Sequence, residues 1–266
     1  MIPSIYYVII TYKPRKEKIR GLLRVLCGRN VIISDNTPEG YPFTSPEKGS
    51  HVVIHNFRDL GYGAGANVGI REALKRKAEW VVILNDDLKM TQNTLSHFEA
   101  YALKGDPCIA GPFAGYFDRK RYTTILNLSG KPVKNPDYMS GSFLAIHKDV
   151  ISRIGLFDER YFIYYDDARY CLSALRVGFP LKQIILPGIY HKDATNVGEN
   201  SWFHQYYLAR NHMLFVEQSA PIGVKLHEVL RMPKTLWEHM SKNETGALAG
   251  IGDYAVRRFG LKEENT

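Results

Sequence analysis

A pair of adjacent aspartates, Asp86 and Asp87, is the first feature of the sequence that could do chemistry. It follows the continuously apolar run Val81–Leu84, which is typical of a strand buried on both faces of a parallel sheet. Such sheets bind ligands at the carboxyl ends of their strands. Adjacent carboxylates repel each other unless a cation, a proton or several donors compensate them, so the pair predicts a site for a hard divalent metal. A solvated turn or the N-cap of a following helix is the alternative.

A second pair, Asp166 and Asp167, follows the aromatic run Tyr161–Tyr165 and opens a helical apolar pattern. Amides in the first turn of a helix stabilise the anionic form of a carboxylate, which is the form that a general base needs. The pair therefore predicts a general base in an aromatic-walled cleft, with an ordinary helix N-cap as the alternative. His191 lies just beyond the last expected strand, where an imidazole could complete a carboxylate metal site or serve the structure alone.

A glycine-rich segment, residues 56–70, precedes the first pair and is expected to form a loop that runs into a helix. Small residues let the backbone approach a phosphate or sugar closely, and a helix N-terminus offers free amides. Gly61, Gly63 and Ala66 also fit the dinucleotide pattern G-x-G-x-x-A, with Asp86 as the ribose-binding acid about twenty residues further on. A nicotinamide-dependent oxidoreductase is therefore a competing hypothesis, although the pattern does not follow its strand immediately. A plain structural turn is the third interpretation.

The order of the expected elements predicts an α/β fold with a mostly parallel central sheet flanked by helices. The expected strands are 6–11, 31–35, 51–55, 81–84, 108–111, 140–146 and 181–186. The expected helices are 15–27, 68–77, 91–103, 148–154, 166–177 and 202–218, and residues 116–137 are expected to form an irregular polar excursion.

The C-terminal part carries an apolar stripe with lysines and arginines nearby. The stripe consists of Ile222, Leu226, Val229 and Leu230. Such a basic amphipathic segment packs on its own domain or lies on an anionic membrane. We expect two domains, residues 1–218 around the sheet and a basic helical extension at residues 219–266.

Composition limits the choice of function. The chain has 266 residues, of which 45% are hydrophobic and 23% charged, and it has neither a run of about eighteen apolar residues nor a signal-peptide pattern, so a cytosolic protein is expected. Its net charge of +8 favours nucleotides, pyrophosphates or anionic lipid headgroups as partners. No zinc-finger spacing or RNP-type strand supports nucleic acid. We interpret Cys27, Cys108 and Cys171 as small buried hydrophobes, because they form no CxxC pair.

The order and spacing of these segments resemble the inverting family 2 glycosyltransferases with a GT-A fold, over roughly residues 5 to 218. Nine motifs carry the resemblance: Val8–Tyr12, Ser34–Asn36, Gly61–Gly69, Leu84–Asp87, Ser140–Ser142, Gly155–Asp158, Tyr161–Gly178, His191 and Tyr207–Asn211.

The resemblance implies a role for each motif. It implies Asp167 as the catalytic base, with Asp166 orienting it or contacting the acceptor. It implies Mn²⁺ or Mg²⁺ held by Asp87 and His191, with Asp86 as a further ligand. The implied nucleotide and donor contacts are Thr11, Tyr12, Asp35, Arg58, Gly65, Asn67, Asn85 and Asp86. The implied acceptor-side residues are Ser140, Gly141, Tyr165 and Arg210.

Two departures from the family pattern matter. Asn85 stands at the first position of the metal-binding DxD element, so direct metal contact is expected first of all from Asp87. The run Asp166–Tyr170 is similar to that of galactofuranosyltransferases, which favours UDP-galactofuranose over dTDP-rhamnose as the donor. The resemblance implies transfer to a hydroxyl of a growing, lipid-linked bacterial surface glycan such as O-antigen, at the cytoplasmic face of the inner membrane. A nicotinamide-dependent oxidoreductase and a non-catalytic sugar-nucleotide-binding module stay open as alternatives.

Overall fold

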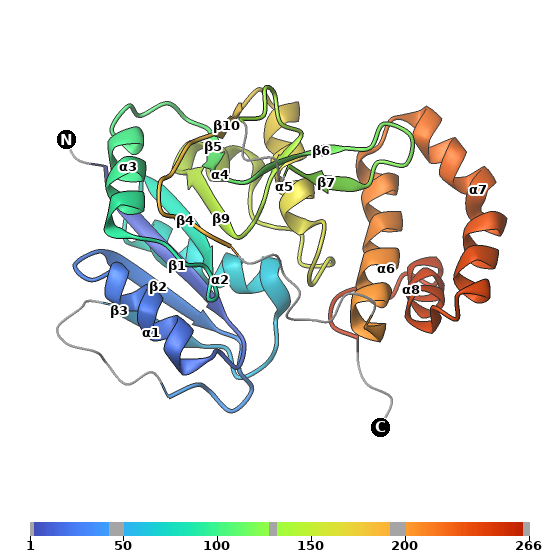
Figure 1. Ribbon diagram of the computed structural model, residues 1–266, viewed down its shortest axis with the longest axis horizontal. Coiled ribbons are helices and arrows are strands. Elements are labelled where there is room, and N and C mark those ends of the chain that lie inside the picture. The colour runs from blue at the N-terminus through green and yellow to red at the C-terminus, as the bar shows by residue number, and fades with distance from the viewer. Residues whose placement is uncertain (1–2, 43–50, 128–131, 192–200, 263–266) are drawn as a thin grey trace.

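The computed structural model describes residues 3–42, 51–127, 132–191 and 201–262. Its centre is a seven-stranded sheet with the strand order β10-β5-β9-β4-β1-β2-β3. These strands are β1 Ile5–Thr11, β2 Asn30–Asp35, β3 His51–His55, β4 Trp80–Asn85, β5 Ile109–Gly111, β9 Phe143–His147 and β10 Leu181–Gln183. Only β9 runs antiparallel to its neighbours, β4 and β5, while the other described pairs are parallel. The predicted mostly parallel α/β sheet is thereby confirmed (Figure 1).

Helices cover both faces of this sheet, with α1 Lys16–Val25 and α3 Gln92–Ala102 on one face and α2 Gly61–Lys75, α4 Lys148–Ile154 and α5 Asp166–Arg176 on the other. Three further helices follow in the chain, α6 Trp202–Ser219, α7 Ile222–Ser241 and α8 Thr245–Ala255. Alternate residues of β1 enter opposite cores: Val8 belongs to the core that includes side chains of α2, α4, α5 and α6, and Tyr7 and Ile9 belong to the core that includes those of α1 and α3. Because both faces are buried, the strands read as continuous apolar runs.

The glycine-rich segment differs from its prediction. We expected a loop followed by a helix at residues 68–77, but α2 already begins at Gly61. A Cβ atom at Gly69 would lie 2.1 Å from Val8 Cγ1, and one at Gly65 would lie 2.9 Å from Asn36 Nδ2. The small residues therefore let the helix pack directly on β1 and β2, and they do not form a dinucleotide-binding loop.

Residues 116–137 also differ from the expected irregular excursion. Part of this region forms a three-stranded antiparallel sheet from β6 Ala114–Phe117, β7 Thr124–Leu126 and β8 Tyr138–Met139. Strands of two to four residues are too short to show an alternating pattern in the sequence. Tertiary packing holds them: the Phe117 ring stacks on Tyr138 at 5.7 Å and meets Phe215 of α6 edge-on at 5.2 Å.

Helices α6, α7 and α8 form a group beside the sheet, with α7 on the outer side (Figure 1). Gly246 and Gly250 allow close packing of α8 on α6, since a Cβ atom at either residue would lie 2.3 Å from a backbone oxygen of α6. The predicted boundary at residue 218 falls at the end of α6, and the division into two domains stays a prediction. Among the described residues, none of the helices combines the length and the apolar character that a membrane span needs.

Two of the three cysteines are buried as predicted, namely Cys108 and Cys171. The prediction for Cys27 is wrong, because this residue follows α1 on the exposed side of the turn.

Candidate functional site

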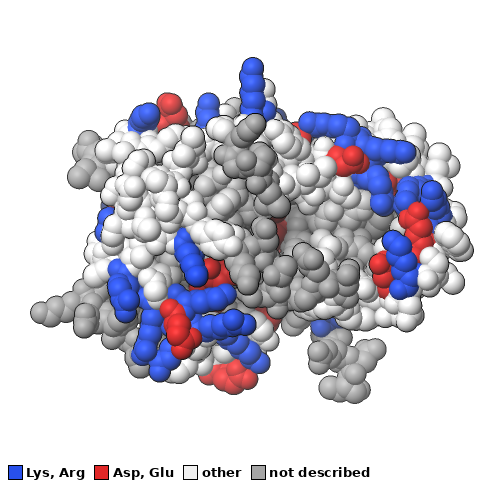
Figure 2. All heavy atoms as spheres, viewed as in Figure 1, with Lys and Arg blue, Asp and Glu red and all other residues white. Residues whose placement is uncertain are grey.

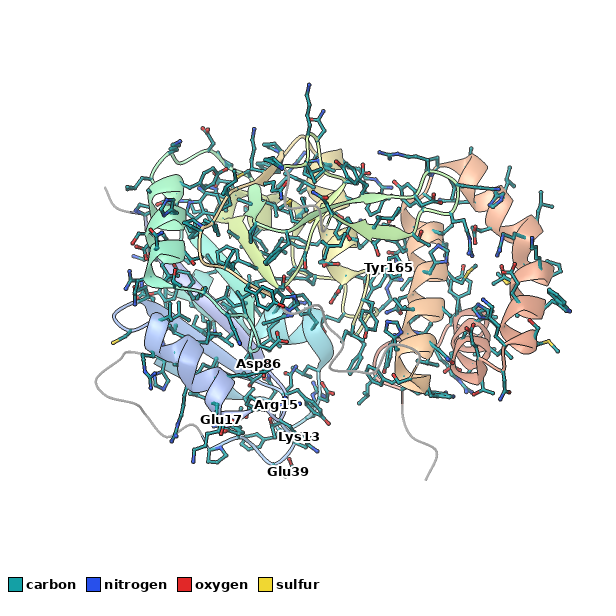
Figure 3. All side chains as sticks on the ribbon, viewed as in Figure 1. Lys13, Arg15, Glu17, Glu39, Asp86 and Tyr165 are labelled. Carbon is teal, nitrogen blue, oxygen red and sulfur yellow. The ribbon has the colours of Figure 1, made fainter. Side chains whose placement is uncertain are left out.

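The predicted donor-side residues gather at one edge of the sheet. Thr11 and Asp35 are register partners at the carboxyl ends of β1 and β2, and Ile10 is opposite Asn85 at the end of β4. A turn closed by the hydrogen bond from Leu88 N to Asn85 O, at 3.3 Å, then presents the two aspartates. In Figure 3 the labelled Asp86 lies at this edge, near the loop that follows β1.

His191 reaches the acidic turn through an antiparallel bridge. The backbones of Lys89 and Tyr190 exchange hydrogen bonds of 2.9 and 2.8 Å, which places the segment after β10 beside the segment after β4. As a result His191 Nε2 lies 3.3 Å from Asp87 Oδ1 and 3.5 Å from Asn85 Nδ2. Two motifs about a hundred residues apart in the sequence therefore meet in one place, as the metal hypothesis requires.

The two adjacent carboxyl groups differ in their electrostatics. Burial, and next the charge of Asp87, raise the pKa of Asp86 to about 6. Burial acts in the same direction on Asp87, but the hydrogen bond and charge of His191 and the ammonium of Lys18 outweigh it and lower the pKa of Asp87. The anion at neutral pH is therefore most firmly established on Asp87, the side chain next to His191.

A carboxylate and an imidazole in contact are donors that suit Mn²⁺. Within the described ranges no group of three or more His, Cys, Asp or Glu side chains could hold a metal ion. Asp87 and His191 would thus supply only part of a coordination sphere, and oxygens of a bound ligand and water would have to supply the rest. The donor set fits a metal that binds together with an oxygen-rich substrate.

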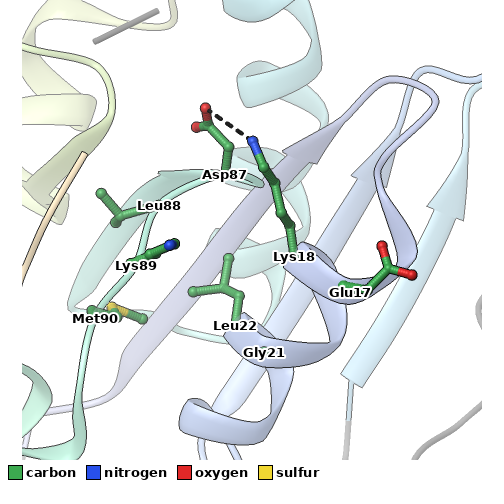
Figure 4. Close-up of a pocket in the computed structure, with 8 residues that line it drawn as sticks. All are labelled: Glu17, Lys18, Gly21, Leu22, Asp87, Leu88, Lys89 and Met90. Carbon is green, nitrogen blue, oxygen red and sulfur yellow. Dashed lines mark ion pairs between the residues drawn. The ribbon is translucent and has the colours of Figure 1, made fainter. Parts of the chain in front are cut away.

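A pocket of about 270 Å³ lies beside Asp87 (Figure 4). Its lining residues are Glu17, Lys18, Gly21, Leu22, Asp87, Leu88, Lys89 and Met90. Lys18 Nζ is 3.8 Å from Asp87 Oδ2, so a cation already faces the carboxylate. Sequence reasoning missed Lys18, although its position one turn into the helix after β1 was a usable signal, because that helix starts at the ligand-binding edge of the sheet.

Asp35 is part of the frame of the site and lies beneath its surface. Its side chain is fully buried. Its oxygens lie within hydrogen-bond distance of Thr11 Oγ1 (3.0 Å), Thr37 N (3.2 Å), Tyr41 N (2.7 Å) and His55 Nδ1 (2.9 Å). Although burial raises the pKa of Asp35, these donors bring it below its ordinary value. In this conformation Asp35 shapes the loop after β2, and a direct contact with a base stays a prediction that requires these partners to move.

Tyr12 is a predicted nucleotide contact that the fold leaves accessible. Its ring is 48% exposed, and Lys13 Nζ lies 5.5 Å from the ring centroid. Thr11 is buried behind it through its bond to Asp35, whereas Arg58 is exposed before the start of α2. An exposed ring beside a lysine offers a stacking surface for a base next to a positive charge for a phosphate.

Two residues predicted to contact the donor, Gly65 and Asn67, are engaged in contacts within the protein. Gly65 lies inside α2 against Asn36, so its backbone is not open to a phosphate. Asn67 is 1% exposed and bridges α2 to the segment before α5. Its side chain donates to Phe157 O at 3.0 Å and to Glu159 Oε1 at 2.9 Å, and it accepts from Phe157 N at 2.8 Å. The structure corrects the expected donor contacts at both positions.

Arg210 and Tyr165 likewise turn inward, which corrects their expected place on the acceptor side. Arg210 is 1% exposed and donates to the backbone oxygens of Arg160, Tyr161 and Gly260. The ring of Tyr165 is buried between α5 and α6, 5.2 Å from that of Phe215 (Figure 3).

The segment before α5 is held in an uncommon backbone conformation. Phe162, Tyr164 and Tyr165 all have φ between 64° and 67°, in the left-handed region that bulky residues rarely adopt. Asn211 of α6 stabilises this segment by donating to the backbone oxygens of Tyr161, Ile163 and Tyr164. Such strain persists only where its surroundings enforce it, so α6 fixes the point at which the second aspartate pair begins.

The two aspartates of α5 have different environments. Asp167 is partly exposed and accepts hydrogen bonds from Gly141 N at 2.9 Å and Ala168 N at 2.7 Å. Asp166 is 5% exposed, and its Oδ1 accepts from Asp167 N at 3.1 Å. Its Oδ2 has no well-formed hydrogen bond within the described part of the chain, although Gly63 of α2 lies close.

Burial, and next the charge of Asp167, raise the pKa of Asp166 well above its ordinary value. Burial also raises the pKa of Asp167, but the amides of Gly141 and Ala168 oppose that shift. The favoured state therefore has one proton on Asp166 and a negative charge on Asp167, because two adjacent carboxylates with limited access to water do not both ionise readily. This arrangement suits Asp167 to accept a proton.

One short segment connects the two acidic sites. Ser142 O accepts from Asn85 N at 3.2 Å, and the neighbouring Gly141 N donates to Asp167. The end of β4 and the start of α5 thus lie on either side of the segment Ser140–Ser142. Ser140 itself is partly exposed, with its Oγ 3.0 Å from Ser142 Oγ. The structure brings both predicted acidic pairs to one site.

Tyr62 belongs to this site and was missed in the sequence. Its hydroxyl donates to Gly141 O at 2.7 Å, and its backbone N–H donates to Phe162 O at 2.6 Å. It therefore links α2 both to the segment that holds Asp167 and to the strained segment before α5. A usable signal was present, since Tyr62 is the only bulky side chain among the small residues 61–66.

Replacing Asp166 with asparagine is expected to stabilise the fold at neutral pH. Because the folded state holds the pKa of Asp166 above that of the unfolded chain, wild-type stability falls as pH rises from about 3.9 through the raised value. Asparagine does not ionise, so the variant should gain about 1–3 kcal/mol above that window and nothing below about pH 3.5. Denaturant unfolding at both pH values measures this, with Asp149→Asn, in the first turn of α4, as the control. An equal gain at both pH values would contradict the assignment.

Comparisons with known proteins agree with this geometry. No family model matches the sequence. The chain is 25% identical over 288 residues to the dTDP-rhamnosyl transferase RfbF of Shigella flexneri, covering 94% of this chain and 96% of the relative. It is also 25% identical over 236 residues to the low-salt glycan biosynthesis hexosyltransferase Agl10 of Haloferax volcanii, covering 80% and 76% of the two chains.

The fold has solved counterparts. The structure aligns with the mannosyltransferase PcManGT of Pyrobaculum calidifontis, solved in complex with GDP-Man and Mn²⁺, with a TM-score of 0.58. The alignment covers 96% of this chain and 76% of that one, at 13% sequence identity, and it bears on the fold alone. The two relatives, matched along most of their length, and the arrangement of the sheet show that the chain is a glycosyltransferase with a GT-A fold, similar to those of family 2.

Proposed function

We propose that this glycosyltransferase moves rhamnose from dTDP-rhamnose, with inversion and with the help of a divalent metal, to a hydroxyl of a growing lipid-linked surface glycan. The observation that carries the proposal is the placement of Asp167 across the segment Ser140–Ser142 from the acidic turn after β4. The match to a dTDP-rhamnosyl transferase over 94% of the chain supports the donor. UDP-galactofuranose is the second candidate, because the run Asp166–Tyr170 is similar to that of galactofuranosyltransferases. The cytoplasmic face of the inner membrane is the proposed place of action.

Asp87 and His191 would hold the metal, Mn²⁺ or Mg²⁺, with Asp86 as a further candidate ligand. Bound there, the cation would offset the negative charge that develops on the departing diphosphate. Lys18 faces the same carboxylate at 3.8 Å and lines the adjoining pocket, so it is placed to attract the diphosphate as well. Tyr12 would stack on the base, and Arg58 and Asn85 stay as proposed donor contacts.

Asp167 would act as the general base. As the acceptor oxygen forms its bond to the anomeric carbon, the hydroxyl proton passes to Asp167 and the bond between that carbon and the diphosphate oxygen breaks. Attack from the face opposite the leaving group inverts the anomeric configuration. Gly141 N fixes the position of Asp167 Oδ2, and the neutral form of Asp166 leaves the negative charge on its neighbour. Ser140 and Gly141 stay as the proposed acceptor-side residues.

A thermal-shift panel tests the donor. dTDP-rhamnose, dTDP, UDP-galactofuranose, UDP, GDP and NAD are each added with Mn²⁺ or with EDTA. We expect the dTDP compounds with Mn²⁺ to stabilise most, since a ligand at about 100 times its Kd adds about 2.7 kcal/mol. Preferential stabilisation by UDP compounds would favour galactofuranose, and stabilisation by NAD in EDTA would contradict the proposal. Binding without donor consumption would indicate a non-catalytic module.

Replacing Tyr62 with phenylalanine is expected to lower kcat about fivefold, because the loss of one buried hydrogen bond worth about 1 kcal/mol loosens the segment that holds Asp167. The donor KM should change less than twofold, since Tyr62 hydrogen-bonds Gly141 O on the Asp167 side of the segment. Steady-state kinetics separates the two parameters, with the partly exposed Tyr116→Phe as the matched control. A rise in KM at constant kcat would contradict a positioning role.

A further inference from the structure

Helix α7 exposes a continuous apolar surface. The side chains of Ile222, Leu226, Val229, Leu230, Trp237 and Met240 are between 57% and 82% exposed, and Pro233 is exposed among them. The sequence left open whether this stripe packs on its own domain. The structure shows that it does not.

These exposed side chains lie on one face of the helix. Apart from the adjacent pair Val229 and Leu230, successive members are three or four residues apart, which matches about 3.6 residues per turn, so they follow one another along the axis. The stripe runs from Ile222 to Met240, a length of about 27 Å at about 1.5 Å per residue. Isolated exposed apolar residues are ordinary, but a continuous apolar surface of this length marks an interaction site.

The acidic residues of α7 are turned away from the stripe or neutralised. Glu228 is buried on the opposite side, where Arg121 of the β6–β7 turn donates to both of its oxygens at 3.2 and 3.3 Å. Arg231 donates to Glu238 at 2.8 Å, and Lys234 pairs with the same carboxylate at 3.9 Å. The ion pair between Glu228 and Arg121 joins the inner side of α7 to the β6–β7 turn, whereas Arg231 and Lys234 neutralise Glu238 within the helix, and the apolar face stays outside.

The charge beside the stripe is positive. Lys234 is the only charged side chain among the exposed residues of α7, all of which the structure describes, and helical spacing puts Lys225 on the other flank of the stripe. Arg119 and Lys120, both exposed, follow in the adjoining β6–β7 turn. Figure 2 shows lysine and arginine side chains gathered on this side of the molecule, with fewer acidic ones among them.

We infer that the exposed face of α7 docks on a lipid bilayer that contains anionic lipids. An apolar helical face flanked by lysines, with a tryptophan near one end, is the pattern of a helix that lies in a membrane interface. The apolar side chains enter the acyl boundary, and the lysines contact the anionic headgroups. The face is too narrow and too polar on its inner side for a spanning segment, so α7 lies along the surface.

Charge decides against a second copy of this chain as the occupant. The chain carries a net charge of +8, so two copies repel each other, whereas an anionic bilayer attracts the same surface. The biological role of this docking rests on the proposed function, because an enzyme bound to the bilayer lies close to a lipid-linked acceptor. The physical basis of the docking is nonetheless independent of the donor and of the reaction.

Vesicle sedimentation of the full chain tests the inference without donor or acceptor. Vesicles of phosphatidylcholine alone are compared with vesicles that also contain phosphatidylglycerol, at low and high salt. The test variant carries Leu226→Ser and Leu230→Ser. The matched control carries Leu103→Ser and Ile185→Ser, which remove two equally exposed apolar side chains elsewhere. Thermal unfolding confirms that each variant is folded, and light scattering reports its oligomeric state.

We expect the wild type and the control to sediment with the anionic vesicles, and the test variant to bind them at least tenfold more weakly. Lys225→Glu with Lys234→Glu should weaken binding to anionic vesicles in proportion to their phosphatidylglycerol content. Equal binding by the wild type and the Leu226, Leu230 variant would overturn the inference, as would no sedimentation of the wild type. Equal binding to neutral vesicles would overturn the anionic preference. A wild-type dimer that the two serines convert to a monomer would instead assign the face to a second copy. Failure of donor turnover in a protein that still binds vesicles would count against the proposed function alone.

Discussion

Replacing Asp167 with asparagine is expected to reduce glycosyl transfer by about 10²–10⁴-fold, the usual contribution of a positioned general base. Asparagine keeps the shape of the side chain but has a single acceptor oxygen, so it keeps only one of the two hydrogen bonds that Gly141 N and Ala168 N donate to the carboxylate. It cannot take a proton from the acceptor hydroxyl. The affinity for the nucleotide should stay within a few fold, because the proposed nucleotide contacts lie across the segment Ser140–Ser142.

The pH dependence of the wild type provides a second measurement. A base must be ionised, so kcat should rise with pH through the pKa of Asp167, which burial holds above its ordinary value. This acid limb should be absent from the residual activity of Asp167→Asn. The control is Asp149→Asn, since Asp149 also lies in the first turn of a helix but away from the site. Near-normal turnover in Asp167→Asn would refute the assignment of the base.

Replacing Asp87 with alanine is expected to abolish the strengthening of nucleotide binding by Mn²⁺ and to lower transfer by at least about a hundredfold, because a metal contributes several kcal/mol to charge stabilisation. Asp87 is the carboxylate in contact with His191, and its hydrogen bond to His191 and the ammonium of Lys18 favour its anionic form. Removing it leaves the imidazole of His191 without the carboxylate that contacts it. Isothermal titration of dTDP and UDP, each with Mn²⁺ and with EDTA, measures the coupling.

Two neighbouring variants sharpen this test. His191→Ala should also weaken the Mn²⁺ effect, since it removes the second donor. Lys18→Ala should act differently: without the ammonium 3.8 Å from Asp87, Mn²⁺ alone should bind more tightly and the diphosphate more weakly. If Mn²⁺ strengthens nucleotide binding in Asp87→Ala as much as in the wild type, the metal site lies elsewhere.

Much of the frame of the site could be predicted from short-range patterns. The apolar run Val81–Leu84 required a strand covered on both faces, and β4 is the fourth of seven in the sheet. The position of Asp86 and Asp87 at its carboxyl end follows from that pattern. The start of α5 at Asp166 was equally visible, because carboxylates favour the first turn of a helix.

The residues that were misplaced are polar groups near a motif. Asn67 and Arg210 were expected at ligands because polar residues beside glycines or aromatics often bind them. Both are 1% exposed and satisfy backbone groups of the segment that leads into α5. The sequence cannot distinguish a ligand contact from a structural role, since a buried backbone carbonyl and a sugar hydroxyl both accept hydrogen bonds from the same side-chain donor. Only the tertiary partner decides.

The glycine-rich segment and α7 are two further places where the sequence alone did not predict the tertiary contacts. Glycine disfavours a helix by about 1 kcal/mol relative to alanine, so α2 was expected to begin later. Close packing on Val8 explains Gly69, and that contact joins residues sixty-one positions apart. In α7 the amphipathic pattern was visible in the sequence, but the sequence did not show whether the apolar face packs on the domain or faces outward. The ion pair between Glu228 and Arg121 turns the polar side inward.

By itself the sequence determined the α/β class, the strand that ends in Asp86 and Asp87, the helix that begins at Asp166, and the family that these motifs resemble. Each depends on patterns within one or two turns or one strand, where periodicity and charge act locally. The tertiary structure decided that His191 meets Asp87, that Gly141 holds Asp167 while Tyr62 holds Gly141, and that α7 shows its apolar face to the outside. These are contacts between segments that are distant in the sequence. Bringing such segments together costs loop-closure entropy, and only the packing of the whole chain offsets that cost.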